Sequence, residues 1–158
     1  MQLTWKSNFF STKRSLFEND QLVGEIYHKT FSDDTLAYLK DVKVLIKKLN
    51  WYGSEYYIYD QATQEQIGRA KFNFWGSKAE IFIGEQHLLF RSRNFWDSKW
   101  AIEEEGKDIV RFETKMVGGT ISGEENTELL SLLGLFLINF KLQRTAAVML
   151  IFMIIIIQ

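Results

Sequence analysis

The sequence predicts a mainly β fold, a closed antiparallel barrel of about twelve strands enclosing an apolar C-terminal helix. Three observations lead to this prediction: a repeat of about 21 residues, strand-like alternation inside each repeat, and a change to apolar residues after Gly123. The chain has 158 residues, of which 46% are hydrophobic and 15% aromatic, which is typical of one domain with a packed core. We therefore expect a single domain over residues 1–158, with the repeated β-meander in residues 1–123.

The repeat is recognised by a bulky pair of residues followed by small or polar ones. Its copies begin at residues 9, 30, 51, 74, 95 and 116. The clearest are Trp51-Tyr52-Gly53-Ser54, Phe74-Trp75-Gly76-Ser77 and Phe95-Trp96-Asp97-Ser98. A spacing of about 21 residues accommodates two strands and two turns. Six such hairpins supply about twelve strands, more than an open twisted sheet usually holds without closing.

Each unit alternates apolar and polar residues between turns such as Asn19-Asp20 and Glu105-Gly106, as expected for strands and hairpins. The second unit is ambiguous because its apolar residues also suit one face of a helix: Leu36, Leu39, Val42, Ile46 and Leu49. We favour strands there because the unit is in register with its neighbours. A helix is the alternative.

Residues 126–158 are predicted to form an apolar helical segment, with its core helix at about residues 145–157. Asn126 or Thr127 is expected to cap it. Its two apolar runs are 129–140 and 146–157, and each is shorter than the roughly 20 residues that a spanning helix needs.

We favour enclosure of this segment, because a wide barrel needs something to fill its lumen. A transmembrane segment formed by joining both runs is disfavoured, because it places Lys141 and Arg144 near the bilayer centre. A membrane-anchored protein of this kind stays an alternative, as does a terminal strand at Ile154–Ile157, whose residues are β-branched.

A repeated β-meander followed by an apolar C-terminal helix resembles the tubby C-terminal-like superfamily, which includes tubby proteins, LURP-one-related proteins and phospholipid scramblases. Ala147-Val148-Met149-Leu150 resembles the start of the scramblase core helix. Tyr57-Ile58-Tyr59-Asp60 and Gln66-Ile67-Gly68-Arg69 resemble small bacterial members. The resemblance covers nearly the whole chain. It implies a closed barrel around a hydrophobic helix and suggests phospholipid binding, but residues 124–128 lack the alternating carboxylates of the scramblase calcium segment.

Composition narrows the possible functions. The formal net charge of −1 provides no overall field for nucleic acid, so no nucleic-acid partner is expected. The absence of cysteine excludes disulfides and thiolate metal sites. The N-terminal residues lack the features of a signal peptide, so we expect a cytoplasmic protein. The resemblance, which suggests phospholipid binding, adds the expectation that it is peripheral to the membrane.

No catalytic constellation, metal site or cofactor motif is recognised. His28 and His87 are the only histidines, and we interpret both as ordinary strand or rim residues. Glu103-Glu104-Glu105 precedes a turn and is predicted to be a solvated loop. The sequence therefore predicts a protein without enzymatic activity.

The candidate binding residues are basic. Arg69 and Lys71 share one strand face, as do Arg91 and Arg93, because side chains alternate along a strand. The candidates for lipid headgroup binding are Lys47, Lys48, Arg69, Lys71, Arg91 and Arg93. The favoured interpretation of these residues is nevertheless a solvated outer face with carboxylates interspersed.

The aromatic pairs at Trp75 and Trp96 suggest either contacts with a membrane interface or closure of the barrel ends. The leading hypothesis is a module that binds anionic phospholipid at a membrane surface or interacts with another protein. The alternative is a barrel that carries an apolar small molecule.

Overall fold

The computed structural model describes residues 1–7, 12–29, 34–49, 54–73 and 76–156, except the side chains of residues 147, 148, 150–152, 154 and 156. Twelve strands and one helix, α1 (Glu128–Ile156), make up the fold. The strands are β1 (Gln2–Ser7), β2 (Lys13–Glu18), β3 (Gln21–His28), β4 (Thr35–Leu39), β5 (Val42–Lys48), β6 (Glu55–Asp60), β7 (Gln66–Phe72), β8 (Lys78–Ile83), β9 (Gln86–Ser92), β10 (Lys99–Glu104), β11 (Lys107–Lys115) and β12 (Gly118–Gly123).

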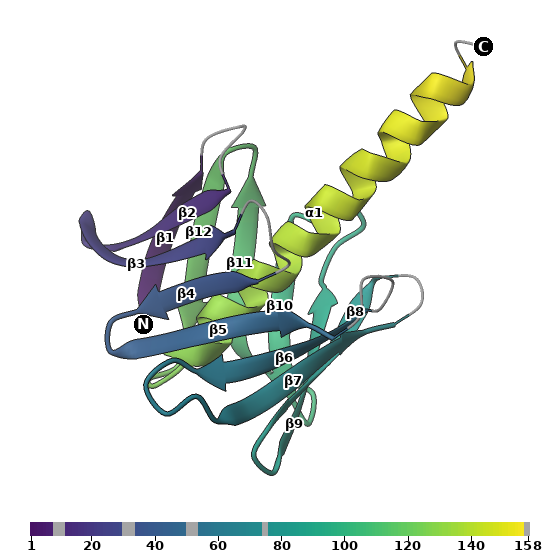
Figure 1. Ribbon diagram of the computed structural model, residues 1–158. Coiled ribbons are helices and arrows are strands. Elements are labelled where there is room, and N and C mark those ends of the chain that lie inside the picture. Colours follow the sequence, from purple (N-terminus) through teal and green to yellow (C-terminus); the bar gives the residue numbers. More distant parts are fainter. Residues whose placement is uncertain (8–11, 30–33, 50–53, 74–75, 157–158) are drawn as a thin grey trace.

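The strands form a closed antiparallel barrel in which each strand pairs with the next along the chain (Figure 1). Pairing of β1 with β12, with Trp5 opposite Gly119, completes the ring. The predicted fold class, a closed twelve-stranded barrel with a C-terminal helix, is confirmed. The ambiguous second unit forms strands, β4 and β5.

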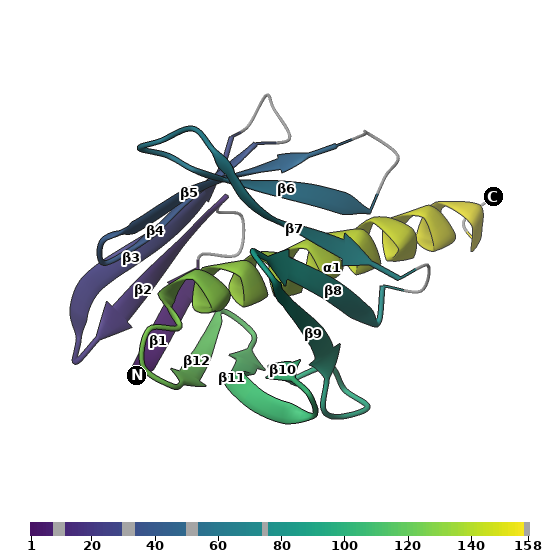
Figure 2. The same ribbon diagram turned by 90° about the horizontal axis from the view of Figure 1, so that it is seen from below.

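Because neighbouring strands alternate in direction, odd-numbered strands stop at one end of the barrel and even-numbered strands at the other. We call the end where β12 stops and α1 begins the helix-entry end. The opposite end, where β1, β3, β5, β7, β9 and β11 stop, is the helix-exit end, because α1 crosses the lumen and leaves there (Figures 1 and 2).

The first half of α1 fills the lumen. Thr127, immediately before the helix, accepts a hydrogen bond from the Ser131 backbone N–H through its carbonyl (2.8 Å). The leucines at 132, 133, 135 and 137 are buried against the inward faces of the strands. Gly134 allows close approach to Phe112, since a Cβ at Gly134 would lie 2.1 Å from the phenyl ring.

The enclosed part of α1 lies earlier in the chain than the expected core helix at about 145–157. Buried positions run from Ser131 to Asn139, whereas the described apolar side chains of the later part, Met149, Met153 and Ile155, are 64%, 56% and 62% exposed. Strands of five to nine residues, tilted in a barrel, span about 20 Å along its axis. About thirteen helical residues cover the same distance. The first apolar run therefore fills the lumen, and the second projects from it.

Candidate functional site

Exposed apolar side chains are concentrated at the helix-exit end. Among the residues that the structure describes, eleven large hydrophobic side chains are exposed, and only Leu22 lies at the helix-entry end. The others lie at the helix-exit end or on α1 beyond it: Tyr27, Leu49, Phe95, Trp96, Met116, Val117, Leu142, Met149, Met153 and Ile155. Clustering of this kind marks an interaction surface, whereas scattered single residues do not.

The β9–β10 connection presents an aromatic pair to solvent on a well-ordered turn. The Asn94 side-chain oxygen accepts the backbone N–H groups of Ser98 (3.0 Å) and Lys99 (3.1 Å). Phe95 and Trp96 then project outward, 91% and 81% exposed, with their rings edge to face at 5.3 Å. Trp96 therefore does not close the barrel end. Trp75, the other aromatic corner named from the sequence, lies outside the described residues.

The β7–β8 connection uses the same hydrogen bonds. The Asn73 side-chain oxygen accepts the backbone N–H groups of Ser77 (2.9 Å) and Lys78 (3.3 Å). Sequence reasoning missed these asparagines, although the signal is present: asparagine precedes the bulky pair in four copies, at Asn8, Asn50, Asn73 and Asn94. In the β9–β10 connection, the asparagine explains how the turn holds Phe95 and Trp96 away from the core.

α1 is fixed at the lumen mouth by Lys141. Its ammonium group lies 2.6 Å from an Asp97 carboxylate oxygen and 4.5 Å from the Trp100 ring centroid. The Trp100 indole N–H donates to the Asp97 carbonyl (2.7 Å). The β9–β10 connection therefore both contacts α1, through Asp97, and carries the exposed aromatic pair.

Charge is also segregated along the barrel axis, although the net charge is only −1. Cations at the strand ends of the helix-exit end are Lys6, Lys13, Lys29, Lys47, Lys48, Lys71, Lys78, Arg91, Arg93, Lys99 and Lys115, and Lys141 and Arg144 follow on α1. The acidic residues described at that end are fewer: Asp34, Glu55, Glu80, Asp97 and Glu113.

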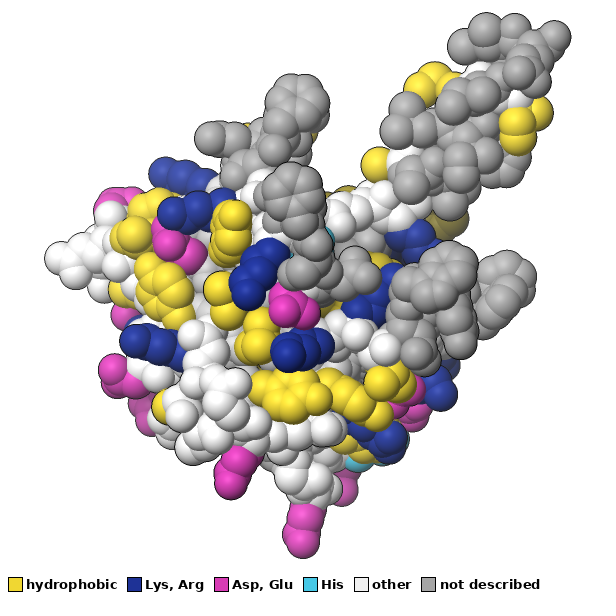
Figure 3. All heavy atoms as spheres, viewed as in Figure 1, with side chains coloured by type: hydrophobic (Ala, Val, Ile, Leu, Met, Phe, Trp, Pro, Cys, Tyr) yellow, Lys and Arg dark blue, Asp and Glu magenta, His cyan; other side chains and the backbone are white. Residues whose placement is uncertain are grey.

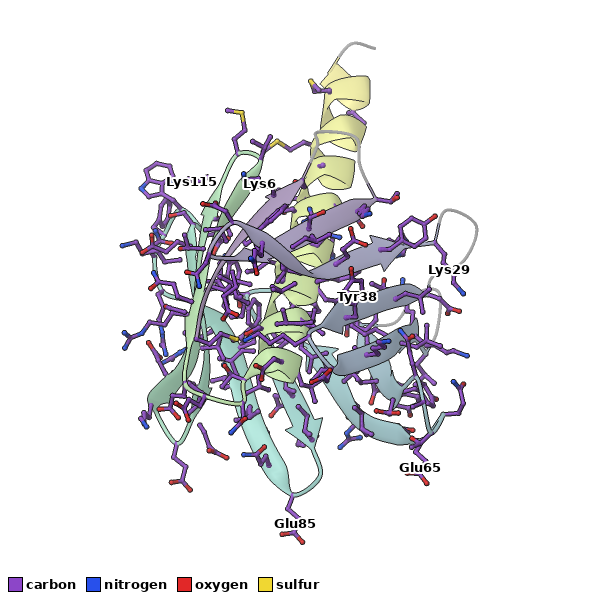
Figure 4. All side chains as sticks on the ribbon, turned by 90° about the vertical axis from the view of Figure 1, so that its left-hand side faces the viewer. Lys6, Lys29, Tyr38, Glu65, Glu85 and Lys115 are labelled. Carbon is purple, nitrogen blue, oxygen red and sulfur yellow. The ribbon has the colours of Figure 1, made fainter. Side chains whose placement is uncertain are left out.

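The helix-entry end has the opposite composition. Its acidic residues are Glu18, Asp20, Asp41, Asp60, Glu65, Glu85, Glu104, Glu105, Asp108, Glu124, Glu125 and Glu128, against the cations Lys40, Lys43 and Lys107. Figure 4 shows Lys6 and Lys115 near the projecting helix, and Glu65 and Glu85 at the far end. On the face in Figure 3, acidic side chains form the lower tip of the molecule. The protein therefore carries an electrostatic dipole that its net charge conceals.

A polar cavity of about 220 Å³ opens beside α1 at the helix-exit end. Inward-facing groups of neighbouring strands line it together with the helix: His28, Thr35, Lys48, Tyr56, Phe136, Asn139, Phe140 and Gln143. The His28 Nδ1 lies 2.9 Å from the Thr35 hydroxyl, and Tyr56 packs edge to face on Phe136 at 5.0 Å. The cavity is thus lined by hydrogen-bonding groups, the Lys48 ammonium group and aromatic rings.

Arg14 is a further cation that faces the lumen at this end. It pairs across the sheet with Ile26, which is buried, and its guanidinium lies 5.6 Å from the Trp5 ring centroid. Burial lowers the pKa of Arg14 to about 10, because the charged form loses hydration. Within the described part of the chain, no carboxylate lies within ion-pair distance of Arg14.

The sequence-predicted headgroup candidates divide into different environments. Lys47 faces outward near the Tyr59 ring (5.6 Å), whereas Lys48 faces the cavity. Arg69 and Lys71 both face outward, as expected. The Arg69 guanidinium lies 3.7 Å from Glu55 and 4.5 Å from the Phe82 ring.

Arg91 and Arg93 belong to an ion-pair cluster. Both contact Glu103, Arg91 at 3.1 Å, and Arg93 also contacts Asp108. Burial alone raises the pKa of Asp108, but hydrogen bonds from Arg111 and Arg93 outweigh it and the net shift is downward. The carboxylates compensate these arginines, which leaves them less available to an external phosphate.

The prediction that residues 103–105 form a solvated loop is wrong for Glu104, which belongs to β10, and most clearly for Glu103. This side chain is only 6% exposed. A register shift between Ile102 and Glu103 interrupts the alternation of β10, so that consecutive residues are covered, and the two arginines neutralise the carboxylate.

The histidines lie apart, on β3 and β9. His87 is exposed beside Glu80 (3.1 Å). The described part of the chain has no group of three His, Asp or Glu side chains able to hold a metal ion. Across the same residues, no helix combines the length and apolar character needed to cross a membrane.

Comparison with protein-family profiles, curated proteins and solved structures finds no match for this chain.

Proposed function

We propose that this protein is a non-enzymatic module that attaches to anionic phospholipid membranes through the helix-exit end of its barrel. The observation that carries the proposal is the coincidence, at one end, of clustered cations and exposed apolar side chains, with acidic residues at the other end. Cations attract an anionic lipid surface, and exposed Trp and Phe side chains partition into its interface. The opposite end is repelled, which sets the orientation.

The resemblance to the tubby C-terminal-like superfamily is consistent with this proposal, and membership in that superfamily is part of it. A twelve-stranded barrel around a C-terminal helix is the architecture that the resemblance implies. The alternative of a carrier for an apolar small molecule has less support, because the first half of α1 occupies the lumen.

Vesicle co-sedimentation tests the proposal. Protein is mixed with phosphatidylcholine vesicles, with or without phosphatidylserine, at low and high salt. We expect binding to the anionic vesicles that weakens as salt shortens the Debye length from about 10 Å at 0.1 M to about 3 Å at 1 M. Failure to bind any vesicle contradicts the proposal and leaves a protein-interaction module.

Matched charge variants test the orientation. Combining Lys6→Gln with Lys115→Gln removes two cations from the helix-exit end, and each is expected to contribute about 1 kcal/mol near an anionic surface. Affinity should therefore fall at least about tenfold. The control combines Lys43→Gln with Lys107→Gln, which removes the same charge from the helix-entry end. Equal effects of the two pairs contradict docking by one end.

A further inference from the structure

We infer that the distal segment of α1, residues 146–156, inserts end-on into one leaflet of the bilayer and anchors the docked barrel. This inference rests on the proposed function and specifies how the contact is made. Two other modes are conceivable for an apolar helix that projects from a barrel: lying flat in the interface, or pairing with a second copy of the chain.

The sequence of the segment argues against a flat orientation. A helix that lies in the membrane interface has one polar and one apolar face. Residues 146–156, AAVMLIFMIII, contain no polar side chain on any face. A helix that is apolar all round requires an apolar environment all round, which an inserted orientation provides.

The exposure of the segment shows that the barrel does not supply that environment. Met149 and Met153 are separated by about one helical turn, whereas Ile155 points roughly 120° away from Met149. All three are more than half exposed. The segment is therefore uncovered on more than one side, and a single flat partner surface cannot cover it.

The dimensions fit one leaflet. The residues from 146 to 156 rise about 16 Å along a helix, and half of a typical hydrocarbon core is about 15 Å. The last cations before the segment are Lys141 and Arg144, so full insertion places them at the level of the lipid phosphates. Phe95 and Trp96 are exposed on the connection whose Asp97 pairs with Lys141, so they lie on the same side of the barrel as the segment and are positioned for the headgroup region.

Charge decides between lipid and a second copy. Two copies that pair through their distal segments end to end bring two cationic barrel ends together, which is repulsive. An anionic leaflet provides negative charge for the cationic barrel end and hydrocarbon for the apolar segment. The occupant that fits both features is an anionic bilayer.

Depth measurements on single-cysteine variants test the insertion. The chain contains no cysteine, so Thr145→Cys, Met149→Cys, Met153→Cys and Glu85→Cys each give one labelling site for an NBD fluorophore. With vesicles of phosphatidylcholine and phosphatidylserine, we expect a blue shift and protection from iodide at 149 and 153. A nitroxide deep in the acyl chains should quench position 153 most, and one near the headgroup should quench position 145 most. Position 85, at the helix-entry end, should stay in water.

The outcomes separate the inference from the proposed function. If the protein sediments with anionic vesicles but the labels at 149 and 153 remain accessible to iodide, docking is electrostatic and the insertion is wrong. If the protein binds no vesicle, both fail. A blue shift in the absence of lipid, together with a dimeric mass in solution, overturns the insertion in favour of a second copy.

A matched pair of substitutions supplies an independent readout. Met153→Asp places a carboxylate in the hydrocarbon and should lower vesicle affinity at least about tenfold. Leu22→Asp makes the same type of change at a comparably exposed apolar residue of the helix-entry end and should leave affinity unchanged. Both sites are exposed, so both variants should fold. Equal affinities of the two variants overturn the inference.

Discussion

The two halves of α1 are similarly apolar but lie in opposite environments. From Ser131 to Asn139 the side chains are buried by the barrel, whereas Met149, Met153 and Ile155 are exposed on the projecting half. The difference shows that an apolar sequence predicts that a helix needs an apolar environment, but does not predict whether the barrel or another partner provides it. The barrel can cover about thirteen helical residues, and the others need another apolar partner.

The largest expected effect contrasts a truncation in each half. Leu137→Ala removes a fully buried side chain and should lower the free energy of unfolding by about 2–5 kcal/mol. Met149→Ala changes an exposed residue and should alter stability in the absence of lipid by less than about 0.5 kcal/mol. Urea unfolding measures both. If Met149→Ala lowers the free energy of unfolding by a comparable amount, the projecting half packs on protein in solution.

Overpacking the enclosed half should have a somewhat smaller effect. Gly134→Ala creates a Cβ that collides with the Phe112 ring, and the strain should cost about 1–3 kcal/mol. Thermal unfolding measures it, and Phe112→Leu in the same background should recover part of the loss. The absence of any destabilisation contradicts the tight contact between α1 and β11.

The aromatic pair next to the projecting half should affect binding rather than folding. Replacing Phe95 and Trp96 by serine removes two exposed rings and should weaken binding to anionic vesicles about tenfold, with little change in the melting temperature. Asn94→Ala keeps the rings but removes the side-chain acceptor that orders the turn, so it should give a partial loss. A double variant that binds like the unmodified protein contradicts an interfacial role.

The smallest expected effect concerns Arg14, which faces the lumen at the helix-exit end. Folding lowers the pKa of Arg14 to about 10 because burial disfavours the cation, so the charge destabilises the fold. Arg14→Met should therefore raise the free energy of unfolding by on the order of 1 kcal/mol. The gain is fully present below pH 10 and shrinks above it, as folded Arg14 loses its proton. A variant that is less stable at pH 7 contradicts this interpretation of the site.

Much of the barrel was predictable because its signal is local. Alternation in segments such as Tyr56–Ile58 reports one buried face, and the spacing of the bulky pairs indicates how many hairpins follow one another. The outward direction of Arg69 and Lys71 was also predictable from alternation. The prediction failed for Glu103, because a register shift in β10 is not visible in the pattern of one strand.

The candidate site was less predictable, because it depends on residues far apart in the chain. The six basic candidates were chosen strand by strand, yet Glu103 and Asp108 from neighbouring strands compensate Arg91 and Arg93. Arg14 and the cavity beside His28 appear only when the strands close into a ring.

By itself the sequence determined a closed β-barrel of about twelve strands followed by an apolar helix, since these depend on periodicity and composition. Only the tertiary structure decided which half of α1 is enclosed and that cations and exposed apolar residues share one end. The physical reason is that the strand directions and the barrel height determine the end at which each residue lies, and neither quantity is encoded in any short segment.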